Sequence, residues 1–261
     1  FVITFVNTHH HHTLLKELME PRFREQGLED IHLAQVVNAG RGSGDTTGSQ
    51  GLVELCEAFY KLRPAFEELV ESLLPTTTTT TTTTTPTPSS SRPPLTCIIS
   101  DLYNYFMQDI ASEFGLKYVA FWTASAGMLA TAMSVVAHGH RAPPPHHEHV
   151  KKEEPLITWI PGVPPLKRSE FNGFLLNPDP EDLMYHIYHT SYTRLPEATC
   201  VVMNTFEELE AESLAALRID NEPLEIYSVG PLLPDSYLDK ASEKNGDGDD
   251  DGDGGGQQQQ H

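Results

Sequence analysis

The segment from Cys97 to Thr123 places one acidic residue where an apolar strand meets a helix. Cys97–Ile99 is a short apolar run that leads into Asp101, and apolar residues then recur at helical spacing as far as Phe114. A second β-branched and aromatic run follows and ends in Thr123. This pattern predicts two neighbouring parallel strands joined by a helix. Asp101 and Thr123 are then expected just past the carboxyl ends of these strands, where open α/β sheets bind their ligands.

The rest of the chain alternates between strand-like and helix-like segments in the same way. Strands are expected at 1–6, 31–37, 97–99, 117–122, 200–204 and 224–229. Helices are expected at 13–26, 52–74, 102–114, 125–138, 180–194 and 207–217, and the proline-rich stretch 157–180 is expected to be irregular. This alternation predicts an α/β fold with a doubly wound, Rossmann-like parallel sheet.

Three segments have compositions that cannot bury apolar surface. They are a threonine and proline tract at about 76–94, a proline and histidine segment at about 139–154, and an Asp, Gly and Gln tail at 239–261. Such compositions predict disorder. We therefore expect one Rossmann-like domain over residues 1–238, interrupted by two disordered insertions and followed by a disordered tail.

The charge and the cysteines exclude several classes of function. The formal net charge of −20 argues against binding to nucleic acid or to anionic membrane surfaces. No apolar run reaches the roughly 18–20 residues that span a membrane. The three cysteines, Cys56, Cys97 and Cys200, form no CxxC pair, so we expect them to be reduced and buried in a cytoplasmic protein.

Two groups of histidines and a glycine-rich segment are poor candidates for binding sites. His9–His12 are expected in a loop after the first strand, and His146, His147 and His149 in a solvated loop, with metal-ligand spacing in neither group. The segment 39–51 contains neither GxGxxG nor GK[ST], so we expect a flexible connection there and no phosphate site. No metal site is predicted.

Six blocks of this sequence stand out, in this order: FVITFVNT (1–8), CIISDLYNYF (97–106), FWTASA (121–126), WIPGVPPLKRSEF (159–171), VVMNTFEELE (201–210) and IYSVGPLLP (226–234). Taken together, they resemble the acceptor-binding N-terminal half of plant family 1 UDP-sugar-dependent glycosyltransferases. The resemblance implies the N-terminal half of a GT-B fold, truncated at both ends. The first strand of the family's sheet and the donor-binding domain are expected to be missing. The missing central strand predicts either a gap or a non-native pairing between residues 1–6 and 97–99.

Asp101 matches the family's aspartate that holds a catalytic histidine and stabilises its protonated form. We therefore expect Asp101 to be a catalytic residue. The family's histidine follows the first strand, so the resemblance implies that this chain starts too late to contain it. The alternative for Asp101 is a helix N-cap, a role that is compatible with the catalytic one.

The resemblance also assigns a donor contact and an acceptor pocket. Thr123 matches the position that binds a hydroxyl of the donor sugar, and its alternative role is to cap the helix from Ser125. The expected acceptor-pocket residues, which could equally be ordinary core residues, are Leu102, Tyr103, Trp122, Met184 and Tyr188. At the start of another helix, Thr205 is expected to act as a cap.

The activity implied by the resemblance is transfer of a hexose, most often glucose, from a UDP-sugar to a hydroxyl of a small acceptor such as a flavonoid, another phenolic or a terpenoid. The UDP-sugar is a co-substrate, and no cofactor is expected. UDP-glucose binding is expected only with the missing C-terminal domain, so we expect negligible activity from this chain alone. The alternative is a non-catalytic relic that binds a small ligand or a partner protein.

Overall fold

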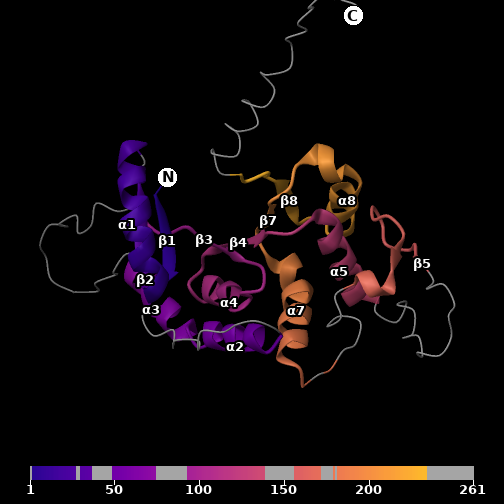
Figure 1. Cartoon of the computed structure of the whole chain (residues 1–261), viewed down its shortest axis with the longest axis horizontal. Coiled ribbons are helices and arrows are strands. Elements are labelled where there is room, and N and C mark those ends of the chain that lie inside the picture. The colour runs from indigo at the N-terminus through magenta and orange to yellow at the C-terminus, as the bar shows by residue number, and fades with distance from the viewer. Residues whose placement is uncertain are drawn as a thin grey trace, which may run out of the picture.

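The computed structural model describes residues 2–27, 30–36, 49–74, 93–138, 156–171, 179 and 181–233 (Figure 1). The expectations for the glycine-rich segment, the two insertions and the tail fall on residues outside these ranges. No helix in the described ranges is long and apolar enough to cross a membrane.

A four-stranded parallel sheet forms the centre of the molecule. Its strands are β3 (Cys97–Asp101), β4 (Lys117–Trp122), β7 (Cys200–Met203) and β8 (Glu225–Ser228), in the order β3-β4-β7-β8. All three pairings are parallel, and Asp101 lies opposite Phe121 in the β3–β4 register. The predicted α/β class and parallel sheet are therefore confirmed.

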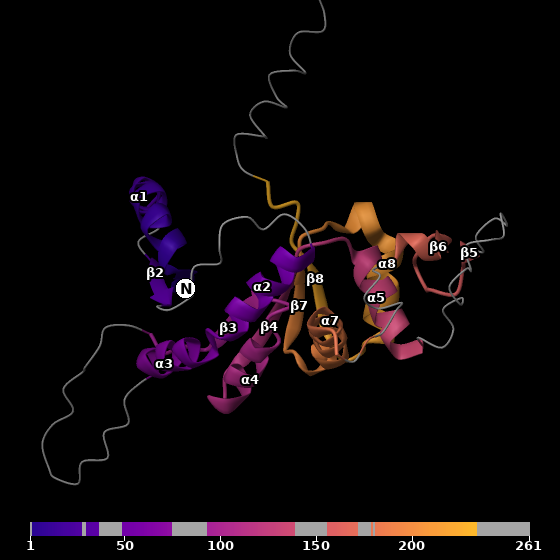
Figure 2. The same ribbon diagram turned by 60° about the horizontal axis from the view of Figure 1, so that its bottom comes forward.

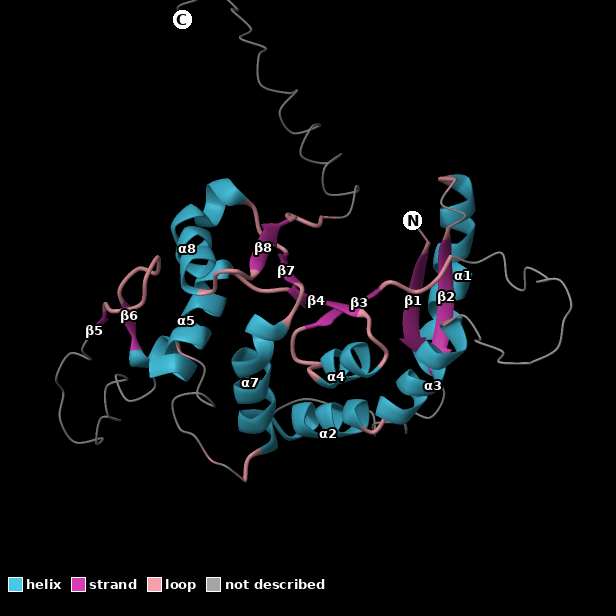
Figure 3. Ribbon diagram, turned by 180° about the vertical axis from the view of Figure 1, so that it is seen from behind, coloured by secondary structure: helices cyan, strands magenta, loops and turns pink. Residues whose placement is uncertain are grey.

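Four helices pack on this sheet and on one another. They are α4 (Phe106–Glu113), α5 (Ala126–His138), α7 (Leu183–Arg194), which continues into a 3₁₀ turn η3 (Leu195–Glu197), and α8 (Glu207–Asp220). Helix α4 contacts β3 and β4, and α5 contacts both α8 and α7 (Figures 1 and 3). Trp122, Ile110, Leu129, Val201 and Leu214 are almost fully buried in the resulting core.

A separate two-stranded sheet lies beside the β3 edge (Figures 1 and 2). It pairs β1 (Ile3–Thr8) with β2 (Ile31–Val36) in parallel, and α1 (His9–Glu25) connects the two strands. In the described part of the chain β1 does not pair with β3. Of the two outcomes expected at this position, the gap is the one observed.

The expected helix at 52–74 is wrong, because the structure has two helices there. Helix α2 (Ser49–Tyr60) ends before Leu62, and α3 (Arg63–Leu73) carries Pro64 in its first turn. A proline inside a continuous helix would remove a hydrogen bond and clash with the preceding turn, whereas the first turn tolerates it. Leu62, 2% exposed, anchors the break in the core.

Three other expectations need correction. His9–His12 form the first turn of α1 and are not in a loop. The segment expected to be irregular contains an antiparallel pair, β5 (Leu156–Ile157) and β6 (Leu166–Lys167), followed by a short 3₁₀ turn η2 (Arg168–Glu170). The three cysteines are free, as expected, but they are only partly buried.

Candidate functional site

Asp101 is the last residue of β3, at the carboxyl edge of the sheet. One of its carboxylate oxygens accepts a hydrogen bond from the backbone N–H of Tyr103 at 2.9 Å, which closes a tight turn. Helix α4 begins only at Phe106, and its N-cap residue is Tyr105. The N-cap alternative for Asp101 is therefore wrong. The carboxylate instead orders the turn that leaves the strand.

The surroundings of Asp101 raise the pKa of its carboxyl group. Burial is the main cause, and the hydrogen bond from Tyr103 partly opposes it. Burial also raises the pKa of four nearby tyrosines, and the charge of Asp101 contributes to each of these shifts: Tyr60, Tyr103, Tyr118 and Tyr192. Asp101 thus lies among neutral phenol groups. In such surroundings a cationic partner stabilises an ionised carboxylate more strongly than it would in water.

Tyr103 is the centre of an aromatic cluster beside this carboxylate. Its ring makes edge-to-face contacts with Tyr188 at 4.7 Å, Trp122 at 5.8 Å and Tyr192 at 6.1 Å between centroids. The hydroxyl groups of Tyr103 and Tyr192 share a hydrogen bond at 2.8 Å. Tyr60 in α2 donates a hydrogen bond to the Tyr103 carbonyl at 2.7 Å. Side chains from α7 and β4 therefore pack on the ring of Tyr103, two residues after Asp101.

The five residues expected to line an acceptor pocket divide into two groups. Leu102, Trp122 and Met184 are at most 3% exposed and are part of the core, which is the alternative stated for them. Tyr103 and Tyr188 are only half-buried. Of the predicted set, these two are the residues that are not fully buried in the core.

Two members of the aromatic cluster were not anticipated from the sequence. Tyr192 follows Tyr188 by four residues, so helical spacing could have shown that both rings lie on one face of α7. Tyr60 is 43 residues away from its partner Tyr103 and belongs to a different helix. No local pattern in the sequence relates that pair.

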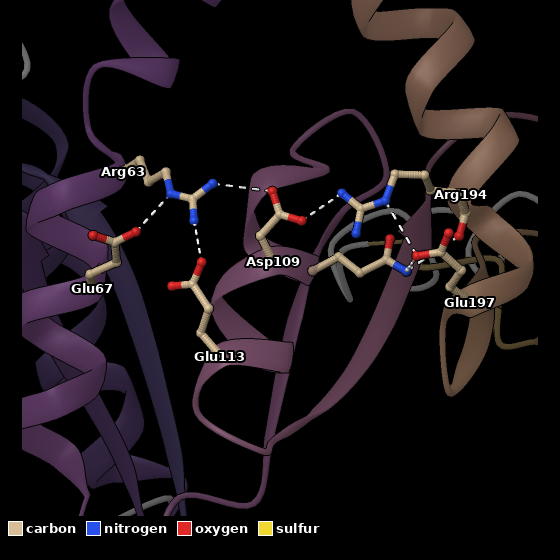
Figure 4. Close-up of polar contacts among 7 residues, drawn as sticks. Arg63, Glu67, Asp109, Glu113, Arg194 and Glu197 are labelled. Carbon is tan, nitrogen blue, oxygen red and sulfur yellow. Dashed lines mark hydrogen bonds and ion pairs between the residues drawn. The ribbon is translucent and has the colours of Figure 1, made fainter.

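An ion-pair network links three of the helices through Asp109 (Figure 4). Asp109 in α4 bridges Arg63 of α3 at 3.1 Å and Arg194 of α7 at 2.7 Å. Arg63 also pairs with Glu67 and Glu113, and Arg194 with Glu197. Each partly exposed pair contributes little alone, about 0–1 kcal/mol. Joined through Asp109, they link α3, α4 and α7, and α7 carries Tyr188 and Tyr192.

Thr123 follows β4 directly and its side chain is exposed. The cap of α5 is Ser125, whose hydroxyl accepts a hydrogen bond from the N–H of Met128 at 3.2 Å. The capping alternative for Thr123 is therefore wrong. Because Asp101 and Phe121 are register partners, Asp101 and Thr123 lie at the same edge of the sheet. The side chain of Thr123 remains available to a ligand there.

Thr205 does not cap α8. The N-cap position belongs to Phe206, and the Thr205 hydroxyl donates instead to the carboxylate of Glu210 at 2.6 Å. Glu207, in the first turn of this helix, forms a two-pronged pair with Arg218 at 2.8 and 3.0 Å. That pair lowers the pKa of Glu207.

The described residues include no group of three or more His, Cys, Asp or Glu side chains that could hold a metal ion.

No family model matches the chain. Among curated proteins, the chain is 30% identical over 255 residues to (R)-mandelonitrile beta-glucosyltransferase of Prunus dulcis, covering 94% of this chain and 48% of that protein. It is 28% identical over 254 residues to UDP-glycosyltransferase 85A8 of Stevia rebaudiana, covering 92% and 47%. The chain spans about half the length of the curated relatives it matches.

Solved structures of UDP-glycosyltransferases share this fold. The structure of UGT2 from Phytolacca americana matches with a TM-score of 0.62 at 18% identity, over 94% of this chain and 48% of that one. A UDP-glucosyltransferase from Polygonum tinctorium matches with a TM-score of 0.63 at 18% identity, over 91% and 49%. The chain therefore has the Rossmann-like fold of half a GT-B glycosyltransferase, and its homologues are plant UDP-glycosyltransferases.

Proposed function

We propose that this chain is the acceptor-binding half of an enzyme that transfers glucose from a UDP-sugar to a hydroxyl group of a small acceptor. One observation carries the proposal. A half-buried carboxylate, Asp101, ends its strand beside half-buried tyrosine rings and shares a sheet edge with the exposed Thr123. An acceptor that packs on Tyr103 and Tyr188 can thus reach both residues.

In this proposal Asp101 acts through a histidine that removes the proton of the acceptor hydroxyl. One carboxylate oxygen is fixed by the Tyr103 amide, and the second can orient the imidazole and stabilise its protonated form. No hydrogen bond joins a histidine to Asp101 within the described ranges. Without a general base the rate falls by about 10²- to 10⁴-fold. We therefore expect negligible glucosyl transfer by residues 1–261 alone.

The aromatic cluster favours flat, largely apolar acceptors. Offset and edge-to-face contacts between rings contribute about 0.5–1.5 kcal/mol beyond the area they bury. A structure of Phytolacca americana UGT2 contains pterostilbene, an aromatic compound, together with UDP-2fluoro-glucose. We propose phenolic acceptors, flavonoids included, as the first class to test and terpenoids as the second. We propose no cofactor or metal, and UDP-glucose binding only with the donor-binding half.

Calorimetric titration with pterostilbene tests the acceptor site on the chain itself. Tyr188→Ala removes a ring that contacts Tyr103 at 4.7 Å, so we expect about tenfold weaker binding, in line with one lost aromatic contact. Tyr185→Ala is the matched control. Its ring, on the same helix, contacts His186 and His189 and not Tyr103.

Equal binding by the Tyr188→Ala and Tyr185→Ala variants, or no binding of pterostilbene or a simple terpenoid alcohol by the wild-type chain, would contradict the acceptor site. Binding that is weakened only by Tyr188→Ala supports it. The alternative, a non-catalytic relic of the domain, predicts the same binding. It differs in predicting that Asp101→Asn has no effect on any transferase activity of a longer chain that also carries the upstream histidine segment and the donor-binding half.

A further inference from the structure

The N-terminus of α5, which follows Thr123 by three residues, is occupied by a carboxylate from another helix. Glu210 of α8 accepts hydrogen bonds from the N–H groups of Ala126 at 2.8 Å and Gly127 at 3.1 Å, one on each of its oxygens. These bonds join residues more than 80 positions apart in the sequence. Two donors and an anion at the positive end of a helix form a strong, charge-assisted contact.

Side chains satisfy the first three N–H groups of α5, and a backbone carbonyl satisfies the fourth. Glu210 takes the first two N–H groups, the hydroxyl of Ser125 takes that of Met128, and the carbonyl of Ser125 takes that of Leu129 at 3.3 Å. The free N–H groups at a helix N-terminus are otherwise a site for phosphate and other anions. Here Glu210 and Ser125 already occupy these N–H groups.

Several contacts hold Glu210 in place. Its backbone departs from helical geometry, with φ −134° and ψ 34°, so α8 is kinked at this residue. The Thr205 hydroxyl donates to the same carboxylate oxygen that binds Ala126, at 2.6 Å. Thr205 is 3% exposed, and its carbonyl accepts a hydrogen bond from Gly230 at 2.7 Å. The carboxylate is therefore fixed by the core and not by a mobile surface side chain.

The turn that carries Thr123 is consequently fixed at both ends. Before it, the Trp122 carbonyl accepts a hydrogen bond from Asn204 at 3.0 Å, and the Trp122 indole donates to the Ser125 carbonyl at 2.8 Å. After it, Glu210 holds the first two residues of α5. Thr123 itself remains exposed between these two anchors.

We propose that Glu210 is a positioning residue for the donor sugar. It fixes the turn that presents Thr123, and its charge keeps the donor's diphosphate away from the end of α5, so that only the neutral sugar approaches this edge. The role of Thr123 rests on the proposed function. The effect of Glu210 on the turn and on anion binding does not.

The test is NMR spectroscopy of the ¹⁵N-labelled chain, with Glu210→Gln, Glu210→Ala and the control Glu208→Gln. Glu208 is exposed on the same helix, so its variant makes the same charge change away from α5. We expect the amides of Ala126 and Gly127 to exchange at least about tenfold faster in both Glu210 variants, because a charge-assisted acceptor is lost. Exchange in the buried strand β7 serves as the reference for global stability and should change little.

Titration with inorganic phosphate distinguishes an opened helix N-terminus from a general loss of stability. In Glu210→Ala, phosphate should shift the Ala126 and Gly127 amides in a saturable way, because the helix end is then open to anions. The wild-type chain and Glu208→Gln should show no such shift. Unchanged exchange in both Glu210 variants, or phosphate shifts at these amides in the wild-type chain, would overturn the proposal.

Failure of this inference is distinguishable from failure of the proposed function. If the Tyr188 titration fails and the Ala126 and Gly127 amides respond as stated, the acceptor site is wrong and the role of Glu210 in fixing the turn stands. If pterostilbene binds as expected and these amides do not respond, the role of Glu210 is wrong.

Discussion

At the scale of single residues, Asp101 reduces the stability of the folded chain near neutral pH. Its folded-state pKa is raised, mainly by burial, above the value in the unfolded chain. Between these two pKa values the folded state holds a proton that the unfolded state has lost. Stability therefore falls as the pH rises through that interval, and the penalty is present in full above the folded pKa. Residues placed for chemistry often carry such a cost.

Asp101→Asn should therefore stabilise the chain at pH 7. The amide oxygen can still accept the hydrogen bond from Tyr103, while the buried charge is gone. We expect the thermal midpoint to rise by about 2–4 °C, the shift that about 1 kcal/mol produces in a domain of this size. The gain in stability should disappear below the unfolded pKa of about 3.9, because the Asp101 carboxyl group is then protonated in both the folded and the unfolded state.

Circular dichroism melts at pH 7 and pH 3.5 measure this difference. Asp30→Asn, at an exposed turn, is the control and should leave the midpoint unchanged at both pH values. An Asp101→Asn midpoint below that of the wild type at pH 7 would show that the carboxylate is stabilised by its surroundings, against the direction of the pKa shift.

At the scale of elements, the loop between β5 and β6 packs against α8 through a glycine. Gly162 has φ +68°, and a Cβ atom there would lie 2.3 Å from the carbonyl oxygen of Glu212. The Gly162 carbonyl also accepts a hydrogen bond from Ser213 at 2.6 Å. Backbone conformation and close packing thus both require glycine at this position.

Gly162→Ala should cost more than about 2 kcal/mol, because it adds a steric clash to the unfavourable positive φ. Gly115→Ala is the matched control. Gly115 has nearly the same φ, +66°, but an added Cβ would meet no atom within 4 Å. It should cost only about 1 kcal/mol. Urea unfolding followed at 222 nm compares the two, and equal costs would show that α8 yields to the added methyl group.

At the scale of the whole molecule, apolar side chains are exposed on an edge strand of each of the two sheets. Ile99 on β3 is 65% exposed, and Ile3 and Phe5 on β1 are 52% and 53% exposed. In the described ranges, β3 and β1 are both edge strands. Edge strands with exposed apolar side chains promote pairing between chains.

The chain should therefore self-associate as its concentration rises, and Ile99→Lys should reduce the association constant by about tenfold or more, because a charge at a strand edge opposes pairing. Ile219→Lys is the control, since Ile219 is 76% exposed on α8 away from β3. Sedimentation velocity over a concentration series measures the effect. If the wild-type chain stays monomeric throughout, or if both variants reduce association equally, the edge of β3 is not the contact.

The sequence by itself determined the features that depend on local patterns. The strands around Asp101 and Thr123, and the alternation that makes the sheet parallel, follow from apolar periodicity and turn residues within short windows. Pro64 could also have indicated the break between α2 and α3, but apolar residues continue at helical spacing on both sides of it and so favoured a single helix.

Tertiary packing decided which distant side chains meet at the site. Tyr60 reaches the Tyr103 carbonyl across 43 positions, and Glu210 reaches Ala126 across 84. Packing also decided that Leu102, Trp122 and Met184 belong to the core, while Tyr103 and Tyr188 are only half-buried. A sequence pattern reports which face of an element is apolar. It does not report which element covers that face, because that choice depends on the free energy of the whole packed molecule.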